Sequence, residues 1–157
     1  MPGTIDARLD ELGITLPESS PPTANYVNWR VAGNMLYLAG NNPLDLDGNL
    51  KTGKLGRDMT TRDGYEAARL VGLNLLAAAR AALGGNLDRV VRVVKVYGMV
   101  NAMPHFAEHP GVVNGCSDLF VEVFGEDRGG HARSAIGMES LPFGMCVEIE
   151  AVFEIER

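Results

Sequence analysis

The segment Val147-Glu-Ile-Glu-Ala-Val-Phe-Glu-Ile-Glu156 decides the fold class of this 157-residue chain. Its apolar side chains alternate with side chains that are mostly glutamates. An alternation with a period of two residues is typical of a β-strand that turns one face to the core and the other away from it. A sheet therefore contributes to the core, and we expect the helices of the chain to pack against its apolar face.

Upstream of this strand, the sequence predicts further strands and three helices. We expect strands over residues 26–31, 35–39, 90–100 and 134–138, the first two joined as a hairpin around Ala32-Gly-Asn34. Helices are expected over residues 4–12, 62–83 and 112–124, with Thr4 as the N-cap of the first and Thr60 or Thr61 as that of the second. This pattern predicts an α+β fold, a two-layer domain with a mixed sheet and helices on one face.

Length and composition limit what the chain can be. A chain of 157 residues that is 46% hydrophobic suits one domain, in which residues 1–25 form a helix and a linker and residues 26–157 form the core. The net charge is −6 and the basic residues are scattered, which argues against nucleic acid as the main partner. We see no signal peptide and no membrane span, so the expected compartment is the cytoplasm. Cys116 and Cys146 are isolated, and we expect both to be reduced thiols.

Two motif-like segments do not support the chemistry that they suggest. Gly48-Asn-Leu-Lys-Thr-Gly-Lys-Leu55 ends in leucine where a phosphate-binding loop needs a hydroxyl for magnesium. His105-Phe-Ala-Glu-His109 matches a zinc peptidase pattern, which requires both histidines on one continuous helix. Pro104 and Pro110 flank this segment, and we expect a surface loop there. The sequence therefore predicts no metal site and no cofactor.

Arg133 and Glu148 are the residues best suited to carry chemistry. Arg133 stands at the entry to a predicted strand, where a guanidinium can hold a carboxylate with two charge-assisted hydrogen bonds. Glu148 lies near the start of the last strand and can move a proton. If the two strands pair through the turn at residues 141–144, these side chains come close together. From their spacing alone, a cross-strand salt bridge is the favoured explanation of such a pair.

Several segments, taken together in their order and spacing, resemble the Rid family (reactive intermediate deaminases, also called the YjgF or endoribonuclease L-PSP-like family). The resemblance covers nearly all of residues 26–156, and residues 8–13 resemble a longer branch of the family with an N-terminal helical extension. The segments that carry it are Tyr26-Val27, Gly33-Asn-Met-Leu-Tyr-Leu-Ala-Gly40, Gly64-Tyr-Glu-Ala-Ala-Arg69, Asn114-Gly-Cys-Ser-Asp-Leu119, His131-Ala-Arg-Ser-Ala135, Ser140-Leu-Pro142 and Val147-Glu-Ile-Glu-Ala151.

The resemblance implies a chorismate-mutase-like subunit that forms a homotrimer with a barrel-like core and a ligand site at each subunit interface. It implies that Arg133 grips the carboxylate of an imine made from an amino acid, and that Glu148 activates water. It further implies that Tyr26, Gly40 and Asn114 line the ligand site. No cofactor is implied.

Three positions depart from the deaminating pattern. Ala39 replaces a serine, Asn41 replaces a glutamine, and Ala135 stands where a cysteine is frequent. A missing hydrogen bond to a charged ligand costs on the order of 1.5–3 kcal/mol. That corresponds to a loss of affinity of roughly ten- to a hundredfold. The sequence thus leaves open an imine deaminase, a non-catalytic binder of small carboxylate or carbonyl metabolites, and an RNA-cleaving protein. The acidic composition argues against the last.

Overall fold

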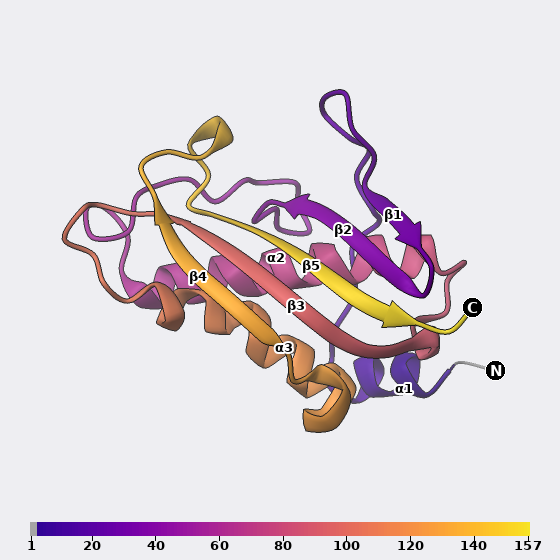
Figure 1. The fold of residues 1–157 in the computed structure, drawn as a ribbon. Coiled ribbons are helices and arrows are strands. Elements are labelled where there is room, and N and C mark those ends of the chain that lie inside the picture. The colour runs from indigo at the N-terminus through magenta and orange to yellow at the C-terminus, as the bar shows by residue number, and fades with distance from the viewer. Residues whose placement is uncertain (1–2) are drawn as a thin grey trace.

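A five-stranded mixed sheet carries two long helices on one of its faces in the computed structural model, which describes residues 3–157 (Figure 1). The strands are β1 (Trp29–Ala32), β2 (Met35–Asn41), β3 (Val90–Asn101), β4 (Ala132–Met138) and β5 (Val147–Ile155). Their order across the sheet is β1-β2-β5-β3-β4, and only β3 and β4 are parallel. The predicted α+β two-layer fold is therefore confirmed.

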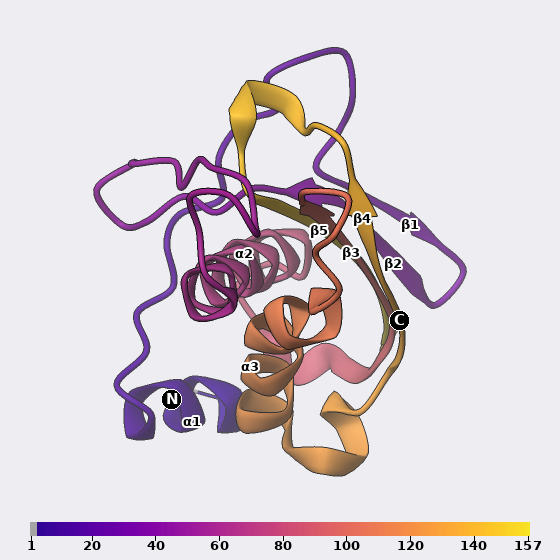
Figure 2. The ribbon, with the colours of Figure 1, turned by 90° about the vertical axis from the view of Figure 1, so that its left-hand side faces the viewer.

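The alternation of β5 has the predicted effect. Val147, Ile149 and Phe153 are fully buried, while Glu150 on the other face is exposed. The two long helices, α2 (Thr61–Ala82) and α3 (His109–Gly129), cover the apolar face of the sheet. In Figure 2 both helices lie on the same side of the strands. The core is the layer of side chains between them.

The contact between α2 and α3 depends on glycine. A Cβ atom placed on Gly115 of α3 would lie 1.9 Å from the Tyr65 carbonyl oxygen of α2, far inside van der Waals contact. A Cβ on Gly72 of α2 would lie 2.8 Å from Leu119 Cδ2 of α3. The two helices approach this closely because neither glycine has a side chain.

The caps of the helices agree with the sequence in one case and not in another. Thr60, one of the two predicted candidates, caps α2, and it does so in a capping box with Asp63. The predicted cap of the first helix is wrong, because Thr4 is the first residue of α1 (Thr4–Glu11). Its backbone N–H and that of Ile5 donate to the Asp88 carboxylate at 2.9 and 2.8 Å. A residue of the short 3₁₀ turn Leu87–Arg89 thus caps α1. Because this residue is more than 80 positions away in the chain, the sequence around α1 does not predict the cap.

Helix α3 begins earlier than predicted and has a break inside it. It starts at His109 instead of residue 112, because Pro110 occupies the first turn, where a missing N–H costs nothing. The expected loop is thus limited to residues 105–108. Gly125, the predicted end, has a positive φ of 82° that interrupts the helix, and a further turn follows to Gly129.

Two further predictions about strands meet different outcomes. The hairpin forms, with Gly33 at φ 63° in its two-residue turn, but β1 starts at Trp29 and not at Tyr26. The direct pairing of the last two strands, which the sequence left open, does not occur, since β3 lies between β4 and β5. Parallel strands need a crossover connection, and α3 connects β3 to β4 in this way. Residues 142–144 form a 3₁₀ turn and not a hairpin turn.

The face of the sheet opposite the helices is uncovered and partly apolar (Figure 2). Tyr37 and Ile136 on this face are 47% and 38% exposed. Tyr37 aligns across the strands with Val152 of β5, and Val152 with Lys95 of β3. A groove of about 130 Å³ follows these residues. Among residues 3–157, no helix is long and apolar enough to cross a membrane.

Candidate functional site

A cavity of about 560 Å³ lies where the end of β2 meets the start of β5. Its wall comes from the segment before β1, from β2, from the 3₁₀ turn at residues 142–144 and from β5. The lining residues are Thr23, Ala24, Tyr26, Val27, Ala39, Gly40, Asn42, Pro142, Phe143, Met145, Glu148 and Glu150. Three of them, Tyr26, Val27 and Phe143, are exposed large apolar side chains. The cavity thus combines an apolar rim with two carboxyl groups.

A β-bulge positions the Glu148 carboxyl group in this cavity. Leu38 of β2 aligns with Ala151 of β5, but Asn41 aligns with Ile149, so the register shifts at Ala39 and Gly40. Bulges of this kind re-aim side chains and are frequent beside active sites. A Cβ atom on Gly40 would lie 3.0 Å from Glu148 Oε2. The carboxyl group therefore lies directly against the bare backbone of residue 40.

The electrostatic environment of Glu148 favours its neutral form. Partial burial, and then the charge of Glu150 on the same strand face, raise the pKa of Glu148 above its ordinary value. Within residues 3–157, no hydrogen bond or salt bridge to a protein group holds this carboxylate. A carboxyl group with a raised pKa and a free lone pair is suited to accept a proton from water.

The other residues predicted for this part of the site have different positions. Tyr26 and Ala39 line the cavity, with the Tyr26 hydroxyl accepting from the Thr23 N–H at 3.4 Å. Asn41 does not line it, because its side-chain amide donates to the Ala39 carbonyl oxygen at 3.0 Å. Its amide is thus used within the bulge.

Arg133 belongs to a second cluster, between β4 and α3. Its Nη1 donates to Asn114 Oδ1 at 2.8 Å and to Ser117 Oγ at 3.1 Å. Ser117 Oγ lies 2.9 Å from His131 Nε2, and His131 Nδ1 lies 2.7 Å from the Gly129 carbonyl oxygen. Ala135, two residues along β4, packs half-buried against the core. Arg133 and Asn114 are thus in direct contact.

Arg133 and Glu148 are not neighbours within the chain. Arg133 aligns with Val96 of β3, whose side chain is buried under the helices. Glu148 aligns with Met99, on the opposite face of β3. Since aligned residues share a face, the two side chains point to opposite sides of the sheet, with β3 between them. The salt bridge that the sequence left open is therefore excluded, and so is their direct approach within one subunit.

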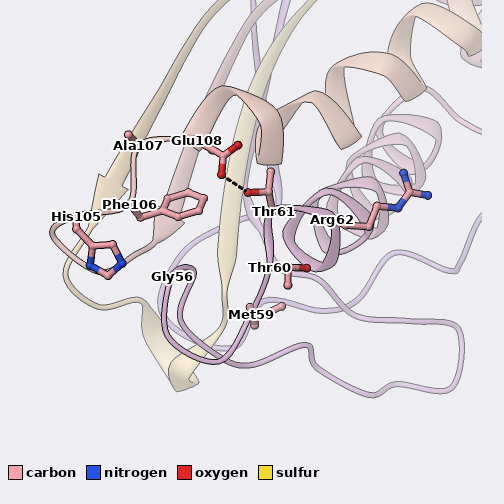
Figure 3. Close-up of a pocket in the computed structure, with 9 residues that line it drawn as sticks. All are labelled: Gly56, Met59, Thr60, Thr61, Arg62, His105, Phe106, Ala107 and Glu108. Carbon is pink, nitrogen blue, oxygen red and sulfur yellow. Dashed lines mark hydrogen bonds between the residues drawn. The ribbon is translucent and has the colours of Figure 1, made fainter.

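The two motif-like segments have structural roles. A pocket of about 660 Å³ lies at the start of α2, and there Glu108 Oε2 accepts from the Thr61 hydroxyl at 2.9 Å. Figure 3 shows the residues that line this pocket and marks this hydrogen bond with a dashed line. His105 lines this pocket, whereas His109 packs over Gly137 of β4. No group of three metal-binding side chains occurs within residues 3–157. In the other segment, Lys54 Nζ donates to Asn101 Oδ1 at 2.8 Å.

Sequence reasoning missed several residues of the two clusters. Phe143 and Glu150 line the cavity, and Ser117 contacts Arg133. The positive φ of Phe143, 58°, follows from the turn before β5 and has no signal in the residue type. Ser117 lies within a segment quoted for the family resemblance, but only the fold shows that it lies beside His131.

Comparisons with known proteins agree on the fold and on a family. Residues 6–151 match the family model described as "YjgF/chorismate mutase-like, putative endoribonuclease". Protein TCP17 of Trypanosoma cruzi is 44% identical over 155 residues, which cover 99% of this chain and 96% of that protein.

Two solved structures are similar over nearly the whole chain. Protein Atu1372 of Agrobacterium tumefaciens, of unknown function, has a TM-score of 0.89 at 45% identity and covers 97% of this chain and 92% of its own. A protein of Shewanella oneidensis described as a "putative endoribonuclease" has a TM-score of 0.92 at 32% identity, and the match covers 98% of this chain and 100% of that protein's chain.

Proposed function

The chain belongs to the YjgF/chorismate mutase-like family, and we propose from this premise that it is an imine deaminase whose sites form between the subunits of a homotrimer. The substrate would be a reactive imine or enamine derived from an amino acid, and the products a keto acid and ammonia. One observation carries this proposal: Arg133 and Glu148, which we expect to bind the carboxylate and to activate water, lie on opposite faces of one sheet. They can act on one small ligand only if two subunits supply them.

The uncovered face of the sheet supports a contact between subunits. This face presents Tyr37, Val152 and Ile136, which a monomer would leave in water. Exposed apolar patches of this kind mark interaction surfaces. Packing it against the β4 edge of a neighbouring subunit would bring the neighbour's Arg133 toward the cavity that holds Glu148. Closed symmetry with three such contacts gives three equivalent sites.

The chemistry needs few groups, because an imine carbon is already electrophilic. Arg133 of one subunit binds the substrate carboxylate and fixes its orientation. Glu148 of the other subunit removes a proton from water, and the water oxygen bonds to the imine carbon. The same carboxyl group returns this proton to nitrogen, which gives a carbinolamine. It then moves the proton of the new hydroxyl group to nitrogen, so that the carbonyl forms, the carbon–nitrogen bond breaks and its electron pair leaves with ammonia. The raised pKa of Glu148 makes its carboxylate a stronger base toward water than an ordinary glutamate.

A second function, binding without turnover, is favoured by Asn41. Its amide is occupied by the Ala39 carbonyl, and Ala39 has no hydroxyl to offer a carboxylate. The same cleft would then hold a small keto acid. RNA cleavage is disfavoured, because the cavity is lined by Glu148 and Glu150 and by no cationic side chain among residues 3–157.

The test measures keto-acid and ammonia release from imines generated in situ by an amino-acid oxidase. We expect wild-type protein to accelerate release, and both Arg133→Ala and Glu148→Gln to lose the acceleration. Glu154→Gln, on the same strand face but outside the cavity lining, is the matched control. Mixing the two inactive variants should restore a fraction of the activity, since mixed trimers contain intact sites. If no imine of a broad panel is hydrolysed faster in the presence of the protein, the deaminase proposal is wrong and binding without turnover replaces it.

A further inference from the structure

We propose that Ser117 and His131 are positioning residues that hold the Arg133 guanidinium in the orientation that binds a carboxylate. The inference rests on the proposed role of Arg133. The family resemblance implies no role for Ser117 or for His131. The observation behind it is a continuous chain of hydrogen bonds, Gly129 to His131 to Ser117 to Arg133, with donor–acceptor distances of 2.7, 2.9 and 3.1 Å.

The donor and acceptor roles along these hydrogen bonds follow from the Gly129 carbonyl oxygen at one end. A carbonyl oxygen only accepts, so His131 Nδ1 must carry the proton that it donates to the Gly129 oxygen. In the neutral imidazole, Nε2 is then an acceptor, and the Ser117 hydroxyl donates to it. Both lone pairs of Ser117 Oγ stay available for donors. The histidine thereby orients the serine so that its oxygen accepts from Arg133 Nη1.

The consequence is a guanidinium with one end occupied and one edge free. The two protons of Nη1 are used by Asn114 Oδ1 and by Ser117 Oγ. Within residues 3–157, Nε and Nη2 of Arg133 make no hydrogen bond with the protein. These two nitrogens form the side-on edge that grips a carboxylate with parallel hydrogen bonds. A preorganised edge of this kind lowers the entropy cost of binding.

Burial and the neighbouring charge favour a neutral His131 whose Nε2 accepts from Ser117. Burial, and also the positive charge of Arg133, lower the pKa of His131, while the hydrogen bond to the Gly129 carbonyl opposes this shift. The imidazole is therefore neutral at physiological pH and keeps its acceptor. A protonated ring would donate from Nε2 and compete with Arg133 for the Ser117 oxygen. Phe120 packs edge-on against the ring, with centroids 6.1 Å apart, and keeps its plane in place.

Two substitutions of His131 separate positioning from packing. His131→Gln keeps a hydrogen-bond acceptor toward Ser117, whereas His131→Phe keeps an aromatic ring against Phe120 and removes the acceptor. We expect His131→Phe to weaken pyruvate binding about tenfold, as for a lost hydrogen bond to a charged group, and His131→Gln to weaken it less. A purely structural ring would give the reverse order, and that result would overturn the inference.

Ser117 offers a second pair of variants. Ser117→Ala removes the oxygen that Arg133 uses, and Ser117→Thr retains it. The pyruvate dissociation constant should rise in the alanine variant and recover in the threonine variant, with the trimer unchanged by light scattering. If Ser117→Ala and wild-type protein bind pyruvate with equal affinity, Ser117 does not position Arg133.

Comparison with Arg133→Ala distinguishes a failure of this inference from a failure of the proposed function. If Arg133→Ala binds pyruvate as well as wild-type protein does, the proposed carboxylate site is wrong. If Arg133→Ala abolishes binding but His131→Phe and Ser117→Ala do not, only the positioning role is wrong. A ligand-independent check is ¹⁵N NMR of His131 at pH 7.5. We expect the tautomer protonated at Nδ1, and a ring protonated at Nε2 would refute the hydrogen-bond chain directly.

Discussion

Gly40 lies against the carboxyl group of Glu148, so that a Cβ atom at residue 40 would stand 3.0 Å from Glu148 Oε2. The β-bulge at residues 39–40 creates this contact. Because the backbone is bare at this point, the carboxyl group can lie inside the cavity without a steric conflict. The position of the acid group is therefore set by a residue on the neighbouring strand.

Gly40→Ala should displace the Glu148 carboxyl group by a few tenths of an ångström. A misplacement of about 1 Å can cost roughly a hundredfold in rate, so a shift of a few tenths of an ångström should cost roughly two- to tenfold. We expect kcat to fall within this range for imine hydrolysis while the melting temperature changes little, since residue 40 is exposed. Steady-state kinetics and a thermal melt monitored by circular dichroism test both parts. An unchanged kcat would show that Glu148 has no role that depends on its position.

Glu150→Gln should move the acidic limb of the pH–rate profile. The charge of Glu150 contributes to the raised pKa of Glu148, although burial contributes more. A general base works when deprotonated, so activity rises as the pH increases through the pKa of Glu148. Without the neighbouring charge, that pKa falls, and the limb should shift to lower pH. A shift to higher pH, or none, would assign the limb to another group.

Ala39→Ser should improve binding of a carboxylate ligand. Ala39 lines the cavity and lacks the hydroxyl that the deaminating pattern has at this position. An added hydrogen bond to a charged group is worth about tenfold in affinity. Calorimetric titration with pyruvate measures the gain, and Ala24→Ser, on the same cavity wall, is the control. Equal gains in both variants would point to a general effect of polarity.

His131 should make the stability of the protein depend on pH. Its pKa in the folded protein is lower than the unfolded value near 6.5, so the unfolded chain binds more protons between these two values. The stabilisation is complete above pH 6.5 and is lost as the pH falls from there toward the folded pKa. We expect the melting temperature to drop over this window in wild-type protein, and to drop less in His131→Gln. Identical pH dependence in the two proteins would contradict a neutral His131.

Gly115→Ala should destabilise the fold without touching either cluster directly. The added methyl group would lie 1.9 Å from the backbone oxygen of Tyr65, which cannot move without displacing α2. Overpacking of this kind costs about 3 kcal/mol or more. Urea denaturation gives the free energy of unfolding, and Glu126→Ala, at an exposed position of α3 outside both clusters, serves as the control. A loss no larger than that of the control would mean that the helices separate easily.

The sequence by itself determined the fold class, most of the secondary structure and the core face of each main element. The period of β5, a threonine cap at the start of α2 and the turn at Gly33 are local patterns, and the chain forms them as predicted. The sequence also singled out Arg133 and Glu148 as the candidate residues for chemistry. Such features depend on interactions within a few residues, which a sequence shows directly.

Only the tertiary structure decided which distant residues meet. The alignments of Arg133 and of Glu148 with β3, which lies between β4 and β5, place their side chains on opposite faces of the sheet, and the proposal of a site between subunits starts from this arrangement. The cap that Asp88 gives to α1 and the contact of His131 with Ser117 arise in the same way. Strand order and long-range contacts depend on how all elements share one core, and no local pattern encodes that choice.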